Sequence, residues 1–351
     1  MYNNTASGKY LHKERGMQYM RVTIKDVARL AGVSVSTASM ALNNKKGISE
    51  ETRMAVMEAA KSLNYRPNKN AQSLKMDRTS TVGLVVPEII NPFFSAIVES
   101  VREEVESCGY TLLLGISGQQ IGKEHKYVDE FISRNVDGII IVPIIGIPQD
   151  LSHLYSLRSM GVPFVFLTTK YDGILADCVM TDLYKGEYLV TKHLLQTGHR
   201  KIFIIAADRK LELSSMRING YISAFREMGV EYKEEWIYET VPDFKHGFEA
   251  ARDIVVKKPD AIITINDILA LGVLKFLKEA SIKVPEEISV AGYDDLLYAS
   301  LAETPLTTVR QPIEDMCAKA VELLVNRIEK VPMEFETHYY EPELKIRNST
   351  R

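Results

Sequence analysis

Long apolar runs are absent from this sequence. No stretch of the 351 residues approaches the ~18 consecutive apolar residues that a membrane-spanning helix needs. The first twenty residues also lack the apolar centre of a secretory signal. We therefore interpret residues 1–20 as a disordered tail, or as a segment upstream of a true start at Met17 or Met20, and we expect a cytoplasmic protein with no membrane partner.

Cysteine is scarce, and the motifs of common cofactor and metal sites are missing. Cys108, Cys178 and Cys317 are isolated in the sequence, without CxxC or Cys/His spacing, which predicts buried free thiols. There is no GxGxxG after the first strand-like run, no phosphate-binding GxxxxGK motif, no HExxH and no GxSxG. The sequence therefore predicts no catalytic residues, no metal and no cofactor, and a protein that is not an enzyme.

Charge is divided unevenly along the chain. Residues 1–78 hold 14 Lys and Arg against 6 Asp and Glu, whereas the remaining residues hold 29 against 40, which gives net charges of +8 and −11. A length of 351 residues, with 46% hydrophobic and 25% charged residues, is typical of a soluble globular protein of two or three domains. A basic head on an acidic body indicates a polyanionic partner for the head alone.

Residues 21–66 have the pattern of three short helices. Thr23 can cap a first helix, Gly32 supplies a break, Ser34 can cap a second helix, and a third can begin after Ser49. Two short helices joined by a tight glycine-containing turn are typical of a helix-turn-helix, whose second helix enters the major groove of DNA.

The exposed side of the second helix offers two kinds of side chain. Short hydroxyl and amide groups suit phosphate oxygens, and the other outward side chains are candidates for reading base edges. The candidates for phosphate contact are Ser34, Thr37, Asn43 and Ser49, and those for base contact are Val35, Ser36 and Met40.

Residues 67–78 form a short polar segment with one large apolar residue, Leu74, among the basic residues Lys69, Lys75 and Arg78. Taken alone, such a leucine is more often a minor core contact. Beside a DNA-reading module, we favour a wedge that opens a step of the minor groove.

From Thr79 onward, short apolar runs alternate with amphipathic helical stretches. A first series contains TVGLVVP, YTLLLGIS, DGIIIVP and VPFVFLTT, and a second contains KIFIIAAD, DAIITIN and ISVAGYD. This rhythm predicts βαβ units and parallel sheets. The predicted fold class is α/β: a small all-α head followed, over residues 79–347, by two doubly wound lobes, with a ligand where the carboxyl ends of their strands face one another.

Several motifs stand in a fixed order along nearly the whole chain. In the head they are TIKDVARLAGVS, STAS, ALN, SEETR, LNYRPN and AQSL, and in the body VGLVVPEIINPFF, GHRKIFII, IND, ISVAGYDD and PLTTVRQP. In this order they resemble the lactose-repressor (LacI/GalR) family of transcriptional regulators. The resemblance implies a hinge helix over residues 67–78 that folds when two subunits meet on DNA, and a body similar to periplasmic sugar-binding proteins.

The resemblance also implies lobe boundaries and DNA contacts. Three crossovers are expected near 177–182, 306–311 and 326–333, which gives an N-lobe of about 79–180 plus 309–328 and a C-lobe of about 181–308 plus 329–347. Met40 stands where the family usually has an arginine, and since methionine cannot donate to guanine, the operator should differ there. The implied contacts are Thr23, Ser34, Val35, Ser36, Thr37, Met40, Asn43 and Ser49 in the helix-turn-helix, and Asn68, Ala71, Leu74 and Lys75 in the hinge.

Strand-end positions and the resemblance together predict an effector site. Asp294 and Asn266 follow predicted strands and can bond to hydroxyl groups, and Arg217 offers five fixed donors. The structural alternatives are a turn cap for Asp294, a surface ion pair for Arg217 and a plain core position for Phe93. The candidates for stacking on the apolar face of a sugar are Phe93, Phe94 and Phe244.

These observations favour a repressor that binds a pseudo-palindromic operator in double-stranded DNA as a homodimer or tetramer. Its DNA affinity would be controlled by a small-molecule effector, a sugar or a related metabolite. The alternative within the family is a catabolite-control regulator whose DNA binding is activated by a phosphorylated carrier protein. A secreted sugar-binding protein would leave residues 21–78 unexplained, and a purely architectural DNA-binding protein would leave the two-lobed body without a role.

Overall fold

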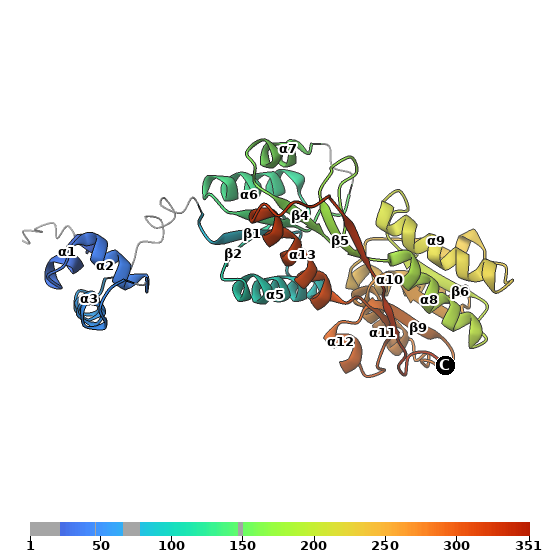
Figure 1. Cartoon of the computed structure of the whole chain (residues 1–351). Helices are drawn as coiled ribbons and strands as arrows, with labels where there is room; N and C mark the ends of the chain where they lie inside the picture. Colours follow the sequence, from blue (N-terminus) through green and yellow to red (C-terminus); the bar gives the residue numbers. More distant parts are fainter. Residues whose placement is uncertain (1–21, 46, 66–77, 147–149) are drawn as a thin grey trace, which may run out of the picture. The chain divides into compact units, whose positions relative to one another are not determined.

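The computed structural model describes residues 22–45, 47–65, 78–146 and 150–351 (Figure 1). It divides the chain into one unit of residues 1–75 and a second of residues 76–351. Residues 67–77 of the predicted hinge and the predicted tail lie outside the described residues. Among the described residues, no helix is long and apolar enough to span a membrane.

The first unit contains the three predicted helices. Val27, Ala38 and Val56 contribute one buried side chain from each helix to a common small core. Gly32 lies between the first two helices with a positive φ of 66°, a conformation that glycine adopts without steric cost. The helices are α1 (Ile24–Leu30), α2 (Val35–Leu42) and α3 (Glu50–Ser62).

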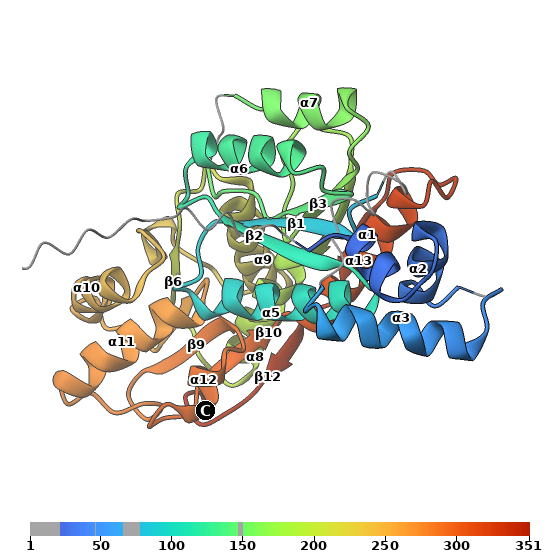
Figure 2. The ribbon, with the colours of Figure 1, turned by 90° about the vertical axis from the view of Figure 1, so that its left-hand side faces the viewer.

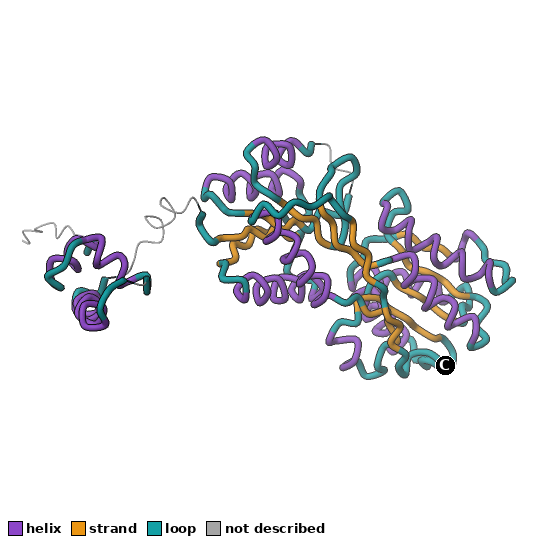
Figure 3. The backbone as a smooth tube through the Cα atoms, in the orientation of Figure 1, coloured by secondary structure: helices purple, strands orange, loops and turns teal. Residues whose placement is uncertain are grey.

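The second unit contains two six-stranded sheets, seen as two orange layers in Figure 3. The first has the strand order β11-β5-β4-β3-β1-β2 and is parallel throughout. The second has the order β12-β10-β9-β8-β6-β7, and only its edge strand β12 is antiparallel. The first sheet contains β1 (Thr81–Val86), β2 (Thr111–Ile116), β3 (Gly138–Ile141), β4 (Phe164–Leu167), β5 (Asp177–Thr181) and β11 (Thr337–Tyr340). The second contains β6 (Ile202–Ala206), β7 (Ile237–Glu239), β8 (Ala261–Thr264), β9 (Ser289–Asp294), β10 (Thr307–Arg310) and β12 (Glu343–Lys345).

Helices cover both faces of each sheet (Figures 1 and 2). In the N-lobe, one core lies beneath α5 and α13, and a separate core lies beneath α6 and α7. In the C-lobe, α8 packs beside α9, and α10 packs beside α11. The N-lobe helices are α5 (Pro92–Ser107), α6 (Ile121–Ser133), α7 (Ser152–Ser159) and α13 (Ile313–Ile328). The C-lobe helices are α8 (Leu183–Gln196), α9 (Glu212–Glu227), η1 (Glu234–Trp236), α10 (Phe244–Val255), α11 (Asp267–Glu279) and α12 (Leu297–Leu301).

The chain crosses between the lobes three times. The first two crossovers follow β5 at Asp182 and β10 at Gln311, so the second N-lobe segment begins after residue 310 rather than at 309. The third was predicted near 326–333, and this is wrong: it lies at residues 341–342. The reason is that β11 pairs in parallel with β5 of the first sheet, and only β12 joins the second.

The prediction of buried free thiols holds for two of the three cysteines. Cys178 and Cys317 are buried free thiols, whereas Cys108, which follows the last turn of α5, is exposed.

His199 is fully buried, and its ring forms hydrogen bonds with the Leu194 carbonyl (3.0 Å) and with the Ser289 hydroxyl (2.8 Å). This histidine therefore ties the end of α8 to β9.

Candidate functional site

The amino end of α2 presents a cluster of hydroxyl groups. The backbone N–H of Thr37 donates to the Ser34 hydroxyl (3.0 Å), and that hydroxyl also lies 2.7 Å from the Ser36 Oγ and 2.8 Å from the Thr37 Oγ1. Ser34 therefore caps the helix while the cluster stays near the surface. Val35, in the same turn, is 43% exposed. A helix N-terminus with hydroxyl donors is suited to phosphate oxygens.

The remaining predicted contacts of the head lie around this helix. Met40 is half-buried, and Asn43 ends α2, where its side-chain amide donates to the Ser39 carbonyl (2.8 Å). Ser49 caps α3 by accepting from the Thr52 N–H (3.2 Å). Thr23 precedes α1, and its hydroxyl and N–H both donate to Asp26. Hydrogen bonding to Thr23 lowers the pKa of the Asp26 carboxyl.

Sequence patterns did not identify Arg53, which holds α2 in place. From α3, its guanidinium donates to the Asn44 side chain (2.6 Å) and to the Lys45 carbonyl (3.0 Å). Both acceptors lie just beyond the end of α2, so this residue fixes where the helix stops. The predicted hinge contacts Asn68, Ala71, Leu74 and Lys75 lie outside the described residues.

A cavity of about 470 Å³ lies between the two lobes of the second unit. Phe93 and Phe94 line it from the N-lobe, and Arg217, Asn266 and Asp294 line it from the C-lobe. The structure thus brings five of the six predicted effector residues together.

Asp294 stands at the end of β9 in an unusual backbone conformation, with φ at 108°, and Asp295 follows with φ at 53°. Its side chain is only 6% exposed and accepts a hydrogen bond from the Gln311 Nε2 (2.7 Å). Burial raises the pKa of Asp294 to about 7, although the charge of Arg217 and the bond from Gln311 oppose the shift. A buried carboxyl with a raised pKa in a cavity is typical of a functional position.

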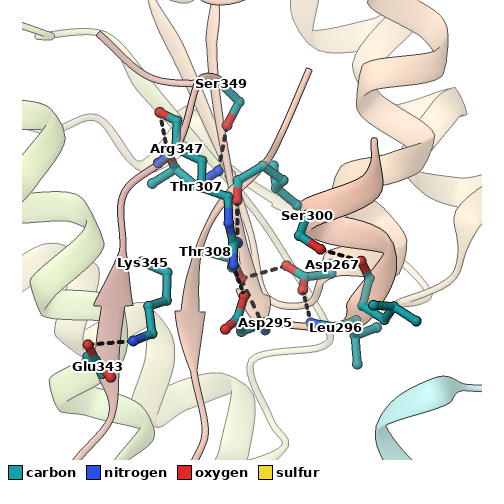
Figure 4. Close-up of polar contacts among 12 residues, drawn as sticks. Asp267, Asp295, Leu296, Ser300, Thr307, Thr308, Glu343, Lys345, Arg347 and Ser349 are labelled. Atoms are coloured by element: carbon teal, nitrogen blue, oxygen red, sulfur yellow. Dashed lines mark hydrogen bonds and ion pairs between the residues drawn. The ribbon is translucent and has the colours of Figure 1, made fainter. Parts of the chain in front are cut away.

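A second buried carboxyl supports this strand end, as Figure 4 shows. Asp267, the first residue of α11, accepts hydrogen bonds from the Leu296 N–H (2.8 Å) and from the Thr308 hydroxyl (2.6 Å). Burial, with the nearby charge of Asp294, raises the pKa of Asp267 well above its ordinary value. Asp295 in turn pairs with Arg347 (2.5 Å). Asp267 and Arg347 therefore both hold the loop that follows Asp294.

Asn266 already has a structural role. It caps α11 by accepting from the Leu269 N–H (2.8 Å), and its amide donates to the Pro242 carbonyl (3.1 Å). A carboxamide offers two donors and two lone pairs, so one donor and one lone pair are left for a ligand. Asn266 therefore caps α11 and can still contact a ligand in the cavity.

The predicted aromatic residues divide into two groups. Phe93 and Phe94 open α5, are buried, and meet edge to face with their ring centroids 5.3 Å apart. Phe244, in contrast, does not line the described cavity, although Val241, Pro242 and Asp243 before it do. Because α10 begins at Phe244, its ring is carried on the helix and is 46% exposed.

Three further lining residues were not among the predicted effector contacts, because single strand ends and loops give no periodic signal. Thr168 lines the cavity after β4 with a strained φ of 72°. Gln311 reaches it from a crossover, and Glu88 has a pKa raised by burial. No group of three or more His, Cys, Asp or Glu side chains that could hold a metal ion occurs in the described part of the chain.

The helical head and the two-lobed cavity define a class of protein: a DNA-reading module joined to a ligand-binding body. Residues 23–68 match the bacterial regulatory proteins of the lacI family, and residues 191–350 match a periplasmic binding protein-like domain. The chain is 33% identical over 331 residues to the HTH-type transcriptional repressor PurR of Photobacterium profundum, covering 94% of this chain and 98% of that protein. The chain belongs to the lacI family and is a DNA-binding transcriptional regulator.

Solved structures agree with this assignment. A complex of the transcriptional regulator CelR with cellobiose has 31% identity and a TM-score of 0.70, over 94% of this chain and all of that chain (100%). A lac repressor dimer bound to operator and the anti-inducer ONPF has a TM-score of 0.83 at 24% identity, over 94% of this chain and 99% of that one. The similarity to the lac repressor structure shows that the two proteins share a fold.

Proposed function

We propose that this regulator is a repressor that binds a pseudo-palindromic operator as a homodimer, and that a neutral sugar in the interlobe cavity controls its affinity for DNA. The proposal of a sugar effector rests on one observation. Two aromatic rings from one lobe and a guanidinium, an amide and a carboxyl from the other line the same cavity. Rings suit the apolar face of a sugar, and these polar groups suit its hydroxyls.

The charges around the cavity support a neutral effector. Three carboxyl groups, those of Glu88, Asp243 and Asp294, line it together with one guanidinium, that of Arg217. The charge of Arg217 already acts on the Asp294 carboxyl, so an anionic ligand such as a phosphate ester would compete with that carboxyl for the guanidinium. The edge-to-face arrangement of Phe93 and Phe94 leaves no parallel pair of rings between which a planar base could stack.

Effector binding can change the affinity for DNA through the relative arrangement of the two lobes. A ligand that touches both lobes favours the arrangement in which both sets of contacts are made, and shifts the population toward it. In this proposal the hinge residues Asn68, Ala71, Leu74 and Lys75 contact the operator, with Leu74 in the minor groove. The lobe arrangement then decides whether the two hinges of a dimer meet.

A thermal-shift screen on the full chain tests the effector class. Cellobiose, ribose, guanosine and hypoxanthine are the probes, and a ligand that binds only the folded chain raises Tm by mass action. We expect a shift from a neutral sugar that is lost in Asp294→Asn and kept in Asp208→Asn, whose carboxyl is not among the described lining residues. A shift from the purine compounds alone would contradict the sugar proposal.

A further inference from the structure

Glu187, in the second turn of α8, is a buried carboxyl without a hydrogen-bonding partner. The residue is 0% exposed, and neither carboxyl oxygen has a partner among the described residues. Burying a polar group without compensation is costly, and burying it as an isolated charge costs far more. Such a group calls for a specific explanation.

Two other unpartnered polar groups belong to the same region. The Nη1 atom of Arg217 and the hydroxyl of Tyr293 are buried and form no hydrogen bond with any described residue. The guanidinium carbon of Arg217 lies 3.9 Å from the centre of the Tyr293 ring. Since Arg217 also lines the effector cavity, its guanidinium connects the cavity to this buried region, and Glu187 lies behind the cavity wall.

Two glycines allow the three elements to come this close. A Cβ atom at Gly186 of α8 would lie 2.1 Å from the Tyr293 hydroxyl oxygen, and one at Gly220 of α9 would lie 2.2 Å from the Tyr184 carbonyl oxygen. Glu187 follows Gly186 directly, and Arg217 lies within one turn of Gly220. The cluster is therefore produced by close packing of α8, α9 and β9.

The charges that act on this cluster come from each of these elements. They are Arg217 on α9, Tyr293 and Asp294 on β9, and Asp182 at the start of α8. Burial raises the pKa of Glu187 to about 8 and that of Asp294 to about 7, and the charge of Arg217 opposes both shifts. Two buried carboxyls thus share one guanidinium as their cation.

We propose that Glu187 is a positioning residue of the effector site: buried behind the cavity wall, it stays protonated, leaves the Arg217 guanidinium to Asp294, and so allows effector binding to release a proton from Asp294. This inference rests on the proposed function, because it takes Arg217 and Asp294 as effector contacts. Sugar hydroxyls that donate to Asp294 stabilise its ionised form. The proton leaves the Asp294 carboxyl and is taken up by the buffer, and Glu187 stays protonated.

The first experiment needs no effector. Carboxyl carbons of the full chain labelled with 13C-glutamate are titrated by NMR, and the resonance missing from Glu187→Gln is assigned to Glu187. Glu212→Gln, at the exposed start of α9, is the control. We expect the assigned resonance to titrate near pH 8, whereas an ordinary glutamate titrates near pH 4.3. Titration in the ordinary range would overturn the proposal.

The second experiment measures binding of cellobiose and of ribose by calorimetry near pH 7, in two buffers of different ionisation enthalpy. Glu187→Gln keeps the shape and the neutral charge of a protonated carboxyl, so we expect affinity within about threefold of the natural chain and unchanged proton release from Asp294. Glu187→Ala leaves a void in the buried cluster, into which Arg217 can shift, and should weaken binding at least tenfold. Unchanged affinity and proton release in Glu187→Ala would overturn the positioning role. If neither sugar binds the natural chain, the proposed effector class fails, and the NMR titration alone decides whether Glu187 carries the proton.

Discussion

Gln311 donates a hydrogen bond of 2.7 Å from its side-chain amide to the carboxyl of Asp294. Asp294 lies in the wall of the cavity, and Gln311 lies at the crossover between β10 of the C-lobe and α13 of the N-lobe. A ligand that engages Asp294 therefore acts on a residue that is directly bonded to a connection between the lobes.

Gln311→Ala should weaken the coupling between effector and operator. The variant loses the donor that stabilises the ionised Asp294, and the contact between cavity and crossover is broken. We expect the effector-induced change in operator affinity to fall at least fivefold, which is the lower range of typical allosteric coupling. Operator titrations with and without effector measure it. Gln196→Ala, at the exposed end of α8, is the control and should keep full coupling.

Asp294→Asn should abolish the effector response and leave effector-independent operator binding intact. Asparagine tolerates the positive φ at this position better than alanine does, so the loop after β9 should keep its shape. The measurement is operator binding over a range of effector concentrations. A variant that responds at the natural concentration would show that the effector does not depend on this carboxyl.

The free energy of unfolding should fall as pH rises from about 5 to 8. The folded chain holds protons on Asp294 and Glu187 up to pKa values of about 7 and 8, whereas the unfolded chain releases them near 3.8 and 4.5. The stability from these groups is therefore complete below the unfolded values and is lost as pH rises through the folded ones. Asp294→Asn should flatten the decline between pH 5 and 8 by roughly 3 kcal/mol.

Urea unfolding at pH 5 and pH 8 measures this slope. Gln196→Ala, at the exposed end of α8, is the control, because it removes no ionisable group and should leave the slope between these values unchanged. An equal slope in the natural chain and in Asp294→Asn would contradict the prediction.

Met40→Arg should change the operator that the head prefers. An arginine at this half-buried position of α2 can donate two hydrogen bonds to guanine, which methionine cannot do, and each such pair discriminates by roughly 1–3 kcal/mol. Selection from a randomised operator library, with both proteins, should show a guanine gained at one position in each half-site. Identical selected sequences would mean that residue 40 does not face the bases.

Leu74→Ala should weaken binding to the operator and leave binding to unrelated DNA nearly unchanged. A wedge in a minor-groove step contributes to specific complexes, whereas non-specific affinity comes from phosphate contacts. Binding to both DNAs at one fixed salt concentration measures the difference. Equal losses on the two DNAs would argue for a core role of this leucine.

The sequence by itself determined the order and kind of most elements. The helical spacing around Val27 and Val56 predicted the head, and apolar runs such as that of β1 predicted the parallel strands, because local periodicity reports which face of an element is buried. The resemblance added the candidate effector contacts, and so predicted Arg217 on α9 with Asn266 and Asp294 at strand ends, and these three line one cavity.

Tertiary structure alone decided the remaining features. The half-exposed strand β11 has no strong apolar pattern, so only its pairing with β5 places it in the first sheet. Phe93 and Phe244 both stand at the start of a helix, and nothing in the local sequence shows that only Phe93 lines the described cavity. Glu187 reads as an ordinary polar residue of an amphipathic helix, and only the close packing of α8, α9 and β9 buries its carboxyl near Arg217. Long-range packing sets the environment of a side chain, and the environment sets its charge.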